Sequence, residues 1–97
     1  MAQIAWTDEA VRWLEDIFQF IAADNPDAAS RTVEGIIARA GALSRYPELG
    51  HRFMHSARNV RILHYDQYRI AYLIKHDGNV DILGVFHDSL DIAKYQL

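Results

Sequence analysis

The stretch that decides the fold reads Ala23-Asp24-Asn25-Pro26-Asp27-Ala28-Ala29-Ser30-Arg31, and it follows a helix-like pattern over residues 11–22. Asn25 is a good acceptor for the free N–H groups that begin a helix. Pro26 suits the first helical position, where its missing N–H costs nothing. One helix therefore ends here and another begins at once, which predicts an antiparallel helix pair.

The first helix of the pair carries apolar residues at intervals of three and four, as a packed amphipathic helix does. These residues are Val11, Leu14, Ile17, Phe18, Ile21 and Ala22. Trp13 and Phe20 lie partly off this stripe and widen it. Thr7 can cap the helix, and residues 3–6 before it are a candidate strand.

The second helix is expected from Pro26 to about Ser44, because Tyr46-Pro47 follows and a residue before proline avoids the α region. Gly35 and Gly41 lie inside this helix. A glycine there costs about 1 kcal/mol relative to alanine. We therefore expect both glycines where the two helices approach closely.

Strand-like runs rich in β-branched and aromatic residues occupy the second half of the chain, at Asn59–Tyr65, Tyr68–Lys75 and Val80–His87. Asp66-Gln67 predicts a tight hairpin turn, and residues 76–79 predict a second turn. Gly84 indicates a bulge in the last strand. Residues 48–57 are expected to form a loop, and residues 90–97 a short helix or a packed tail.

This order of elements predicts an α+β fold of the form β-α-α-β-β-β, in which the N-terminal strand and the helical hairpin pack on a small antiparallel sheet. The first strand is expected at the edge of the meander. Both sheet faces carry apolar residues: Leu63, Ile70, Tyr72 and Ile74 on one, and Val60, Ile62, His64, Arg69, Ala71 and Leu73 on the other. A chain this short has too few elements to cover both faces of the sheet. We therefore expect a partner chain to cover the second face.

The composition predicts one globular domain over residues 1–97, because a chain of this length buries roughly 60–70% of its unfolded surface. The absence of cysteine excludes disulfides and suits a cytoplasmic protein. No apolar run reaches the length of a membrane span, and the first dozen residues include Asp8 and Glu9. We therefore expect neither a membrane segment nor a signal peptide.

The net charge of −3 is unevenly distributed along the chain. Residues 46–75 carry five Lys or Arg against two acids, whereas residues 1–45 carry four against seven and residues 76–97 one against four. An acidic chain with a basic centre argues against broad coating of nucleic acid. The basic centre either meets one anionic or acidic partner or reflects arginines at loops and strand edges.

Few residues are candidates for chemistry. Arg69 is the one charge within residues 68–74, and it is expected to meet either a partner's carboxylate or phosphate, or an internal Asp81 or Asp88. His87 is either an acid–base group or a core histidine. The other histidines lack metal-ligand spacing, so no metal site is expected. No nucleophile elbow, P-loop or dinucleotide fingerprint is present.

Several short motifs recur in a fixed order along the chain. They are Trp6-Thr7, Leu14 with Ile17, Ile21-Ala22, Asn25-Pro26 with Ala28-Ala29 and Arg31, Pro47-Glu48-Leu49-Gly50, Val60-Arg61, Tyr68-Arg69-Ile70-x-Tyr72, and Ile82-Leu83 ahead of Val85-x-His87. In this order they resemble the toxins of ParE/RelE-type toxin–antitoxin modules. The resemblance implies a cytoplasmic toxin, with a role in plasmid stabilisation, that a ParD-like antitoxin binds in a hetero-oligomeric complex. It implies no cofactor, and contact with operator DNA only through the antitoxin.

The resemblance also implies partner-binding residues, which are Arg58, Arg61, Arg69, Tyr72 and His87. The family has two branches: RelE-like members are ribosome-dependent nucleases that cut messenger RNA, and ParE-like members poison DNA gyrase. A nuclease needs cations and an acid or base at the scissile phosphate, and here only Arg69 and His87 match. A common family ending places an arginine three residues after the histidine, where this chain has Leu90.

The isoelectric point of about 5.9 also separates the branches. Work inside the ribosome favours a strongly positive surface, because phosphate contacts supply much of the affinity for RNA. We therefore expect a gyrase poison without catalytic residues of its own. A RelE-like nuclease, or a degenerate toxin that retains only antitoxin binding, is the alternative.

Overall fold

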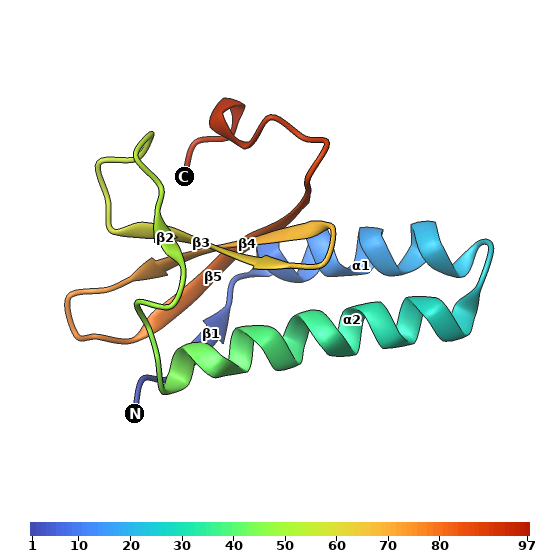
Figure 1. The fold of residues 1–97 in the computed structure, drawn as a ribbon, viewed down its shortest axis with the longest axis horizontal. Helices are drawn as coiled ribbons and strands as arrows, with labels where there is room; N and C mark the ends of the chain where they lie inside the picture. Colours follow the sequence, from blue (N-terminus) through green and yellow to red (C-terminus); the bar gives the residue numbers. More distant parts are fainter.

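The computed structural model describes residues 1–97 as two helices packed with a five-stranded sheet (Figure 1). The elements in chain order are β1 (Ile4–Trp6), α1 (Asp8–Ala22), α2 (Pro26–Gly41), β2 (His51–Arg52), β3 (Val60–Tyr65), β4 (Tyr68–Ile74) and β5 (Val80–His87). Short 3₁₀ turns at Ala42–Ser44 and Ile92–Lys94 extend α2 and close the C-terminal tail. The predicted α+β class is confirmed. Neither helix has the length and apolar character that crossing a membrane requires.

The two helices begin at the residues that the sequence indicates. The Thr7 side chain accepts the N–H of Ala10 at 3.1 Å, and its hydroxyl donates to the Ile82 carbonyl at 2.8 Å. Asn25 accepts the N–H of Ala28 at 3.1 Å, with proline at the first helical position. Thr7 therefore both caps α1 and ties its start to β5.

The sheet has the strand order β1-β5-β4-β3-β2 and is mixed rather than wholly antiparallel. Strands β2 to β5 are antiparallel, but β1 runs parallel to β5, with Ile4 opposite Val80. The expectation of an antiparallel sheet is therefore wrong for β1, although its place at the edge is confirmed. Strand β2, which pairs His51 with Ile62, lies in the segment expected to be a loop.

The first hairpin turn has the predicted two residues. Tyr65 pairs with Tyr68, so the loop between β3 and β4 consists of Asp66 and Gln67. Asp66 has a φ of 51°, in the left-handed region that a short polar side chain tolerates. This turn fixes the register of the hairpin and hence the two faces of the sheet.

Three glycines, one in β5 and two in α2, differ in what their missing side chain makes possible. Gly84 lies next to a register shift, since Ala71 pairs with it while the next residue of β4 skips Leu83, so the predicted bulge is confirmed. A Cβ on Gly35 would overlap the Tyr65 hydroxyl of β3, whereas one on Gly41 would meet nothing. The expectation that both glycines bring the helices together is therefore wrong, because Gly35 makes room for the sheet.

The helix-facing side of the sheet holds the larger core. Leu63, Ile70 and Tyr72 share this face, as predicted, and pack under the helices. The buried members of this cluster are Ala10, Ile36, Ala40, Leu43, Leu63, Ile70, Tyr72, Val80, Ile82 and Val85. Burial of these side chains on folding is the main stabilising contribution to the helix–sheet contact.

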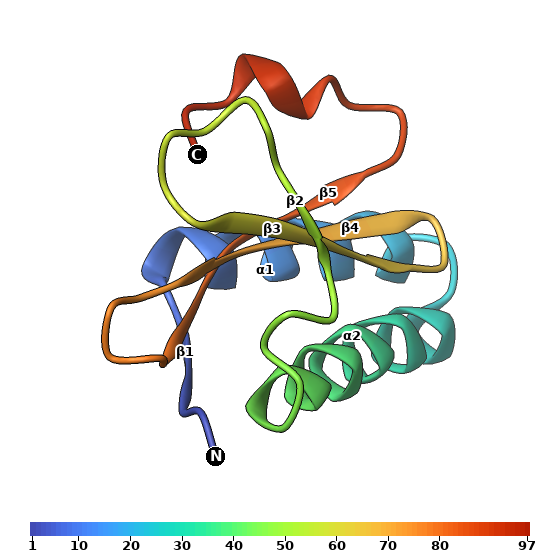
Figure 2. The ribbon, with the colours of Figure 1, turned by 60° about the vertical axis from the view of Figure 1, so that its left-hand side comes forward.

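The opposite face of the sheet is covered by the chain itself. The C-terminal tail and the loop before β3 lie over it, on the side away from α2 (Figure 2). The second buried cluster consists of Phe53, Val60, Ile62, Ala71, Phe86 and Ile92. The expectation that this face needs a partner chain is wrong, because residues on either side of the three main strands return to cover it.

Candidate functional site

Arg69 lies on the sheet face away from the helix pair, as expected, and its guanidinium binds within the chain. Nη2 donates to the Leu90 carbonyl at 2.6 Å, and Nε lies 3.5 Å from Oδ1 of Asp88. The side chain is 19% exposed. Of the two alternatives that the sequence left open, the structure has the internal pair with Asp88, which attaches the C-terminal tail to β4.

Arg58 makes a similar attachment at the far end of the tail. Its Nε and Nη2 donate to the main-chain oxygen of Leu97 at 3.3 and 3.1 Å, and the Ser56 hydroxyl donates to the same atom at 2.9 Å. Arg58 is itself exposed. It is therefore accessible to a partner, although its present contacts are internal.

Arg61 and Tyr72 are opposite one another on β3 and β4, and both hold the Pro47–Gly50 loop. The Tyr72 hydroxyl donates to the Pro47 carbonyl at 2.6 Å and accepts the Gly50 N–H at 2.9 Å. Arg61 Nη1 donates to the Gly50 carbonyl at 2.6 Å. Tyr72 is fully buried, so it serves this loop and is not presented to a partner.

Burial determines the acidity of the Tyr72 phenol. Desolvation raises the pKa of Tyr72 above its ordinary value, against the opposing effects of the Gly50 N–H and the positive charge of Arg61. The phenol is therefore held in its neutral form, which can donate to the Pro47 carbonyl. These contacts hold the Pro47–Gly50 loop against β4.

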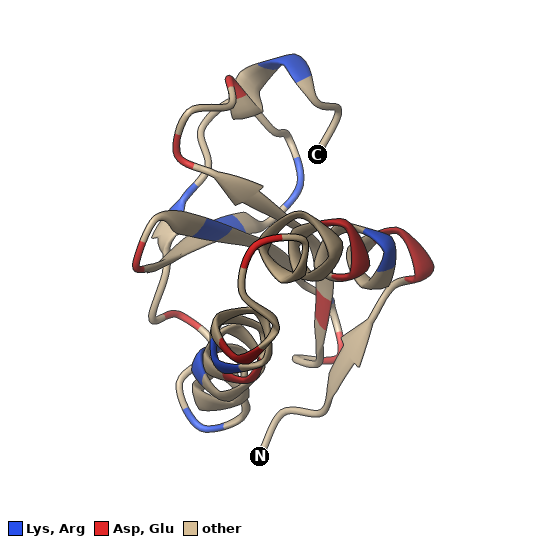
Figure 3. Ribbon diagram, turned by 90° about the vertical axis from the view of Figure 1, so that its right-hand side faces the viewer, with Lys and Arg blue, Asp and Glu red and all other residues tan.

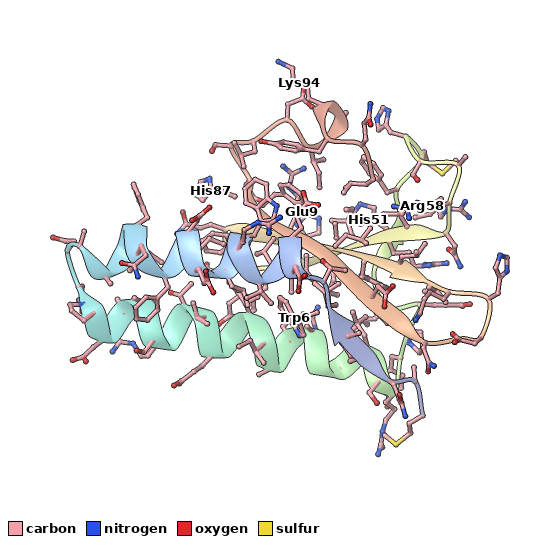
Figure 4. All side chains as sticks on the ribbon, turned by 180° about the vertical axis from the view of Figure 1, so that it is seen from behind. Trp6, Glu9, His51, Arg58, His87 and Lys94 are labelled. Atoms are coloured by element: carbon pink, nitrogen blue, oxygen red, sulfur yellow. The ribbon has the colours of Figure 1, made fainter.

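His87 lies at the end of β5, on the opposite side of the sheet from Arg69. It pairs with Tyr68, whereas Arg69 pairs with Phe86, so the two side chains alternate onto opposite faces. Its Nδ1 lies 2.8 Å from the Ser89 hydroxyl, and its Nε2 lies 3.3 Å from Oε1 of Gln67. Figure 4 shows His87 and Arg58 far apart along the molecule. The predicted site residues therefore do not converge on one surface.

A groove beside His87 was not identified from the sequence. One wall consists of Trp13, Ile17, Phe20 and Ile21 of α1, and the facing side includes Asp66, Tyr68, His87 and Leu90. The volume of this space, called here the α1 groove, is about 750 Å³. The available signal was the position of Trp13 and Phe20 off the main apolar stripe of the helix.

The α1 groove has an acidic character. Asp16 lines the helix wall and Asp66 lines the facing turn, and no lysine or arginine lines the groove. Burial, together with the negative charge of Asp66, raises the pKa of the Tyr68 phenol. The groove can therefore bind apolar groups that carry positive charge nearby.

The other histidines lie apart from further groups that could bind a metal ion. No three His, Cys, Asp or Glu side chains are placed so that they could hold a metal ion. His51 and His64 stack with ring centroids 5.5 Å apart, without a third ligand.

Comparison with known proteins places the chain in a family. Residues 4–92 match the model of the ParE toxin of the type II toxin–antitoxin system parDE. Y4kP of Sinorhizobium fredii, which carries the name of a toxin, is 38% identical over 85 residues, or 88% of this chain and 86% of that protein. Toxin RelE2 of Caulobacter vibrioides is 32% identical over 87 residues, or 90% of this chain and 96% of that toxin.

Solved structures agree with this fold. A chain of the chromosomal ParDE system from P. aeruginosa superposes with a TM-score of 0.72 at 20% identity, covering 90% of this chain and 96% of that one. A chain of the toxin–antitoxin complex RelBE2 from Mycobacterium tuberculosis gives 0.63 at 25% identity, covering 89% and 96%. The protein described here therefore belongs to the ParE toxin family of type II toxin–antitoxin systems.

Proposed function

We propose that this toxin poisons DNA gyrase in the cytoplasm and is neutralised by a ParD-like antitoxin in a hetero-oligomeric complex. The observation that carries the choice of target is the placement of Arg69 and His87 on opposite faces of the sheet. Cleavage of RNA needs a cation at the scissile phosphate and an acid or base within hydrogen-bond reach of the same atoms. Two side chains separated by the sheet do not meet that requirement.

The state of the arginines supports the same proposal. Arg58, Arg61 and Arg69 each donate at least one guanidinium N–H to a main-chain oxygen of this chain, although Nε of Arg61 and Nε of Arg69 have no hydrogen-bond partner. Turning any of these guanidinium groups toward an RNA phosphate would break the internal contacts that it makes. With an isoelectric point of about 5.9, the protein also lacks the net positive charge that phosphate binding favours.

The antitoxin part of the proposal is supported by the structural neighbours, which are toxin–antitoxin systems. Of the residues expected at the partner interface, Arg58 is exposed and His87 is partly exposed, so both can contact a partner directly. Arg61, Arg69 and Tyr72 support the surface from within. Operator DNA is proposed to be contacted only through the antitoxin.

The alternative function is that of a RelE-like, ribosome-dependent nuclease, which similarity to toxin RelE2 favours. Controlled expression in a bacterial host distinguishes the two functions. The proposal predicts filamentation and a DNA-damage response, relieved when the antitoxin is co-expressed. Primer extension that reveals codon-specific cuts dependent on translation would contradict it. A chain that binds the antitoxin without any toxicity would indicate a degenerate toxin.

A further inference from the structure

The α1 groove displays one large apolar side chain, Phe20, that the fold leaves exposed to solvent. Phe20 is 84% exposed although it lies on α1, whose other aromatic residues are at least partly buried. Ile17 and Ile21 lie within one helical turn of it and line the same groove. Phe20 therefore continues the apolar lining of the groove into a contiguous apolar patch, which is the kind of surface that marks an interaction site.

The charges around the groove define the chemistry of its occupant. Asp16 and Asp66 stand on its two walls, and the ion pairs of the molecule, Arg69–Asp88 and Lys75–Asp81, involve neither. Figure 3 shows acidic positions on α1 and at the tip of the β3–β4 hairpin. Complementary charge across an interface speeds association and selects the partner. An occupant with apolar side chains flanked by lysine or arginine fits both features.

We propose that the α1 groove receives an apolar segment of the antitoxin, flanked by lysine or arginine, with Phe20 at its centre and Asp16 and Asp66 as the charge-complementary rim. This inference rests on the antitoxin partnership proposed above and assigns it a place on the molecule. A second copy of this chain is a poorer occupant, because it would bring a protein of net charge −3 to an acidic groove.

The position of His87 extends the argument. Its ring lines the groove and packs edge-on against Tyr68, with centroids 5.6 Å apart. The segment therefore contacts His87, which connects this inference to the residue that the family resemblance indicated. The antitoxin segment lies along α1 and past the end of β5, not on the sheet face that the C-terminal tail covers.

Titration calorimetry with the purified ParD-like antitoxin of the proposed function tests the proposal. Phe20→Ala removes the central apolar contact and should weaken binding about tenfold or more, as truncation of a central anchor does. Asp16→Lys combined with Asp66→Asn should also weaken binding about tenfold or more and should flatten its salt dependence. All three positions are exposed, and asparagine tolerates the left-handed backbone of residue 66, so the melting temperature should not change.

Two matched controls lie outside the groove. Met54→Ala removes an apolar side chain that is 83% exposed, and Glu34→Lys reverses an exposed charge on α2. Both should leave the affinity within about twofold of the wild type. Groove variants that bind as well as these controls would overturn the inference.

Gyrase supercoiling and oligomeric state, measured on the same variants, identify other occupants. If Phe20→Ala loses gyrase inhibition but keeps the affinity for the antitoxin, the groove holds the target and the inference is wrong. If the wild type dimerises and Phe20→Ala does not, the occupant is a second copy, which also overturns it. A wild type that binds the antitoxin through the groove but leaves gyrase active contradicts only the proposed target. A wild type that does not bind the antitoxin contradicts both.

Discussion

Replacing Tyr72 with phenylalanine removes one hydroxyl group that serves two main-chain groups. The hydroxyl donates to the Pro47 carbonyl at 2.6 Å and accepts the N–H of buried Gly50 at 2.9 Å. A typical hydrogen bond contributes about 0.5–1.5 kcal/mol, and a buried donor without a partner costs about 1–3 kcal/mol. We therefore expect Tyr72→Phe to lower the free energy of unfolding by about 2–3 kcal/mol.

Urea unfolding followed by circular dichroism measures this change. The matched control is Tyr46→Phe, because Tyr46 is 59% exposed and its loss should change the free energy by less than about 0.5 kcal/mol. Both variants should show the urea dependence of the wild type, since neither changes the surface that unfolding exposes. A loss below about 0.5 kcal/mol for Tyr72→Phe would refute the reasoning, because the loop would then not depend on the hydroxyl.

Three further predictions concern stability. The pKa of Tyr72 is raised above its ordinary value of 10.0, so at alkaline pH the folded chain keeps a proton that the unfolded chain loses. The stabilisation from this neutral phenol is complete below about pH 10 and is lost as the pH rises through the folded pKa. The urea midpoint should therefore fall between about pH 8 and 11, and it should fall less in Tyr72→Phe. Arg69→Ala should lower the free energy of unfolding by about 1–3 kcal/mol, because the hydrogen bond to the Leu90 carbonyl is lost. Arg69→Lys should restore only part of this stability in the same urea assay. An unchanged urea midpoint in Arg69→Ala would show that Arg69 does not hold the C-terminal tail. Gly35→Ala should destabilise the chain by about 1–3 kcal/mol, because the added methyl group overlaps Tyr65 of β3. Gly41→Ala should stabilise it by up to about 1 kcal/mol, because nothing lies near the added methyl group. Thermal unfolding measures both changes, and equal effects would contradict the contact between Gly35 and β3.

The parts of the fold that could be predicted from the sequence are those that local chemistry determines. Asn25 and Pro26 cap and begin α2 through contacts within three residues, and Asp66-Gln67 closes its hairpin through its own backbone conformation. Alternation along β3 and β4 assigned side chains to the correct faces, because a hairpin with a two-residue loop has one register.

The remaining features depend on contacts between segments that are distant in the chain. The direction of β1 is set by its pairing with β5, some 76 residues later, as in Ile4 opposite Val80. The cover over the second sheet face comes from a tail whose composition did not reveal where it packs. For Arg69 the sequence left a partner and an internal aspartate as alternatives, and it could not indicate the bond to the Leu90 carbonyl, because no residue type signals a main-chain acceptor.

Purified gyrase provides the most direct test of the proposed target. We predict that the purified toxin inhibits supercoiling in a dose-dependent manner and that an equimolar amount of the antitoxin restores activity. Alanine at His87 should leave this inhibition in place, because no catalytic step is assigned to that residue. Undiminished supercoiling at a large excess of toxin, together with cleavage of messenger RNA on translating ribosomes, would contradict the account and assign the toxin to the nuclease branch.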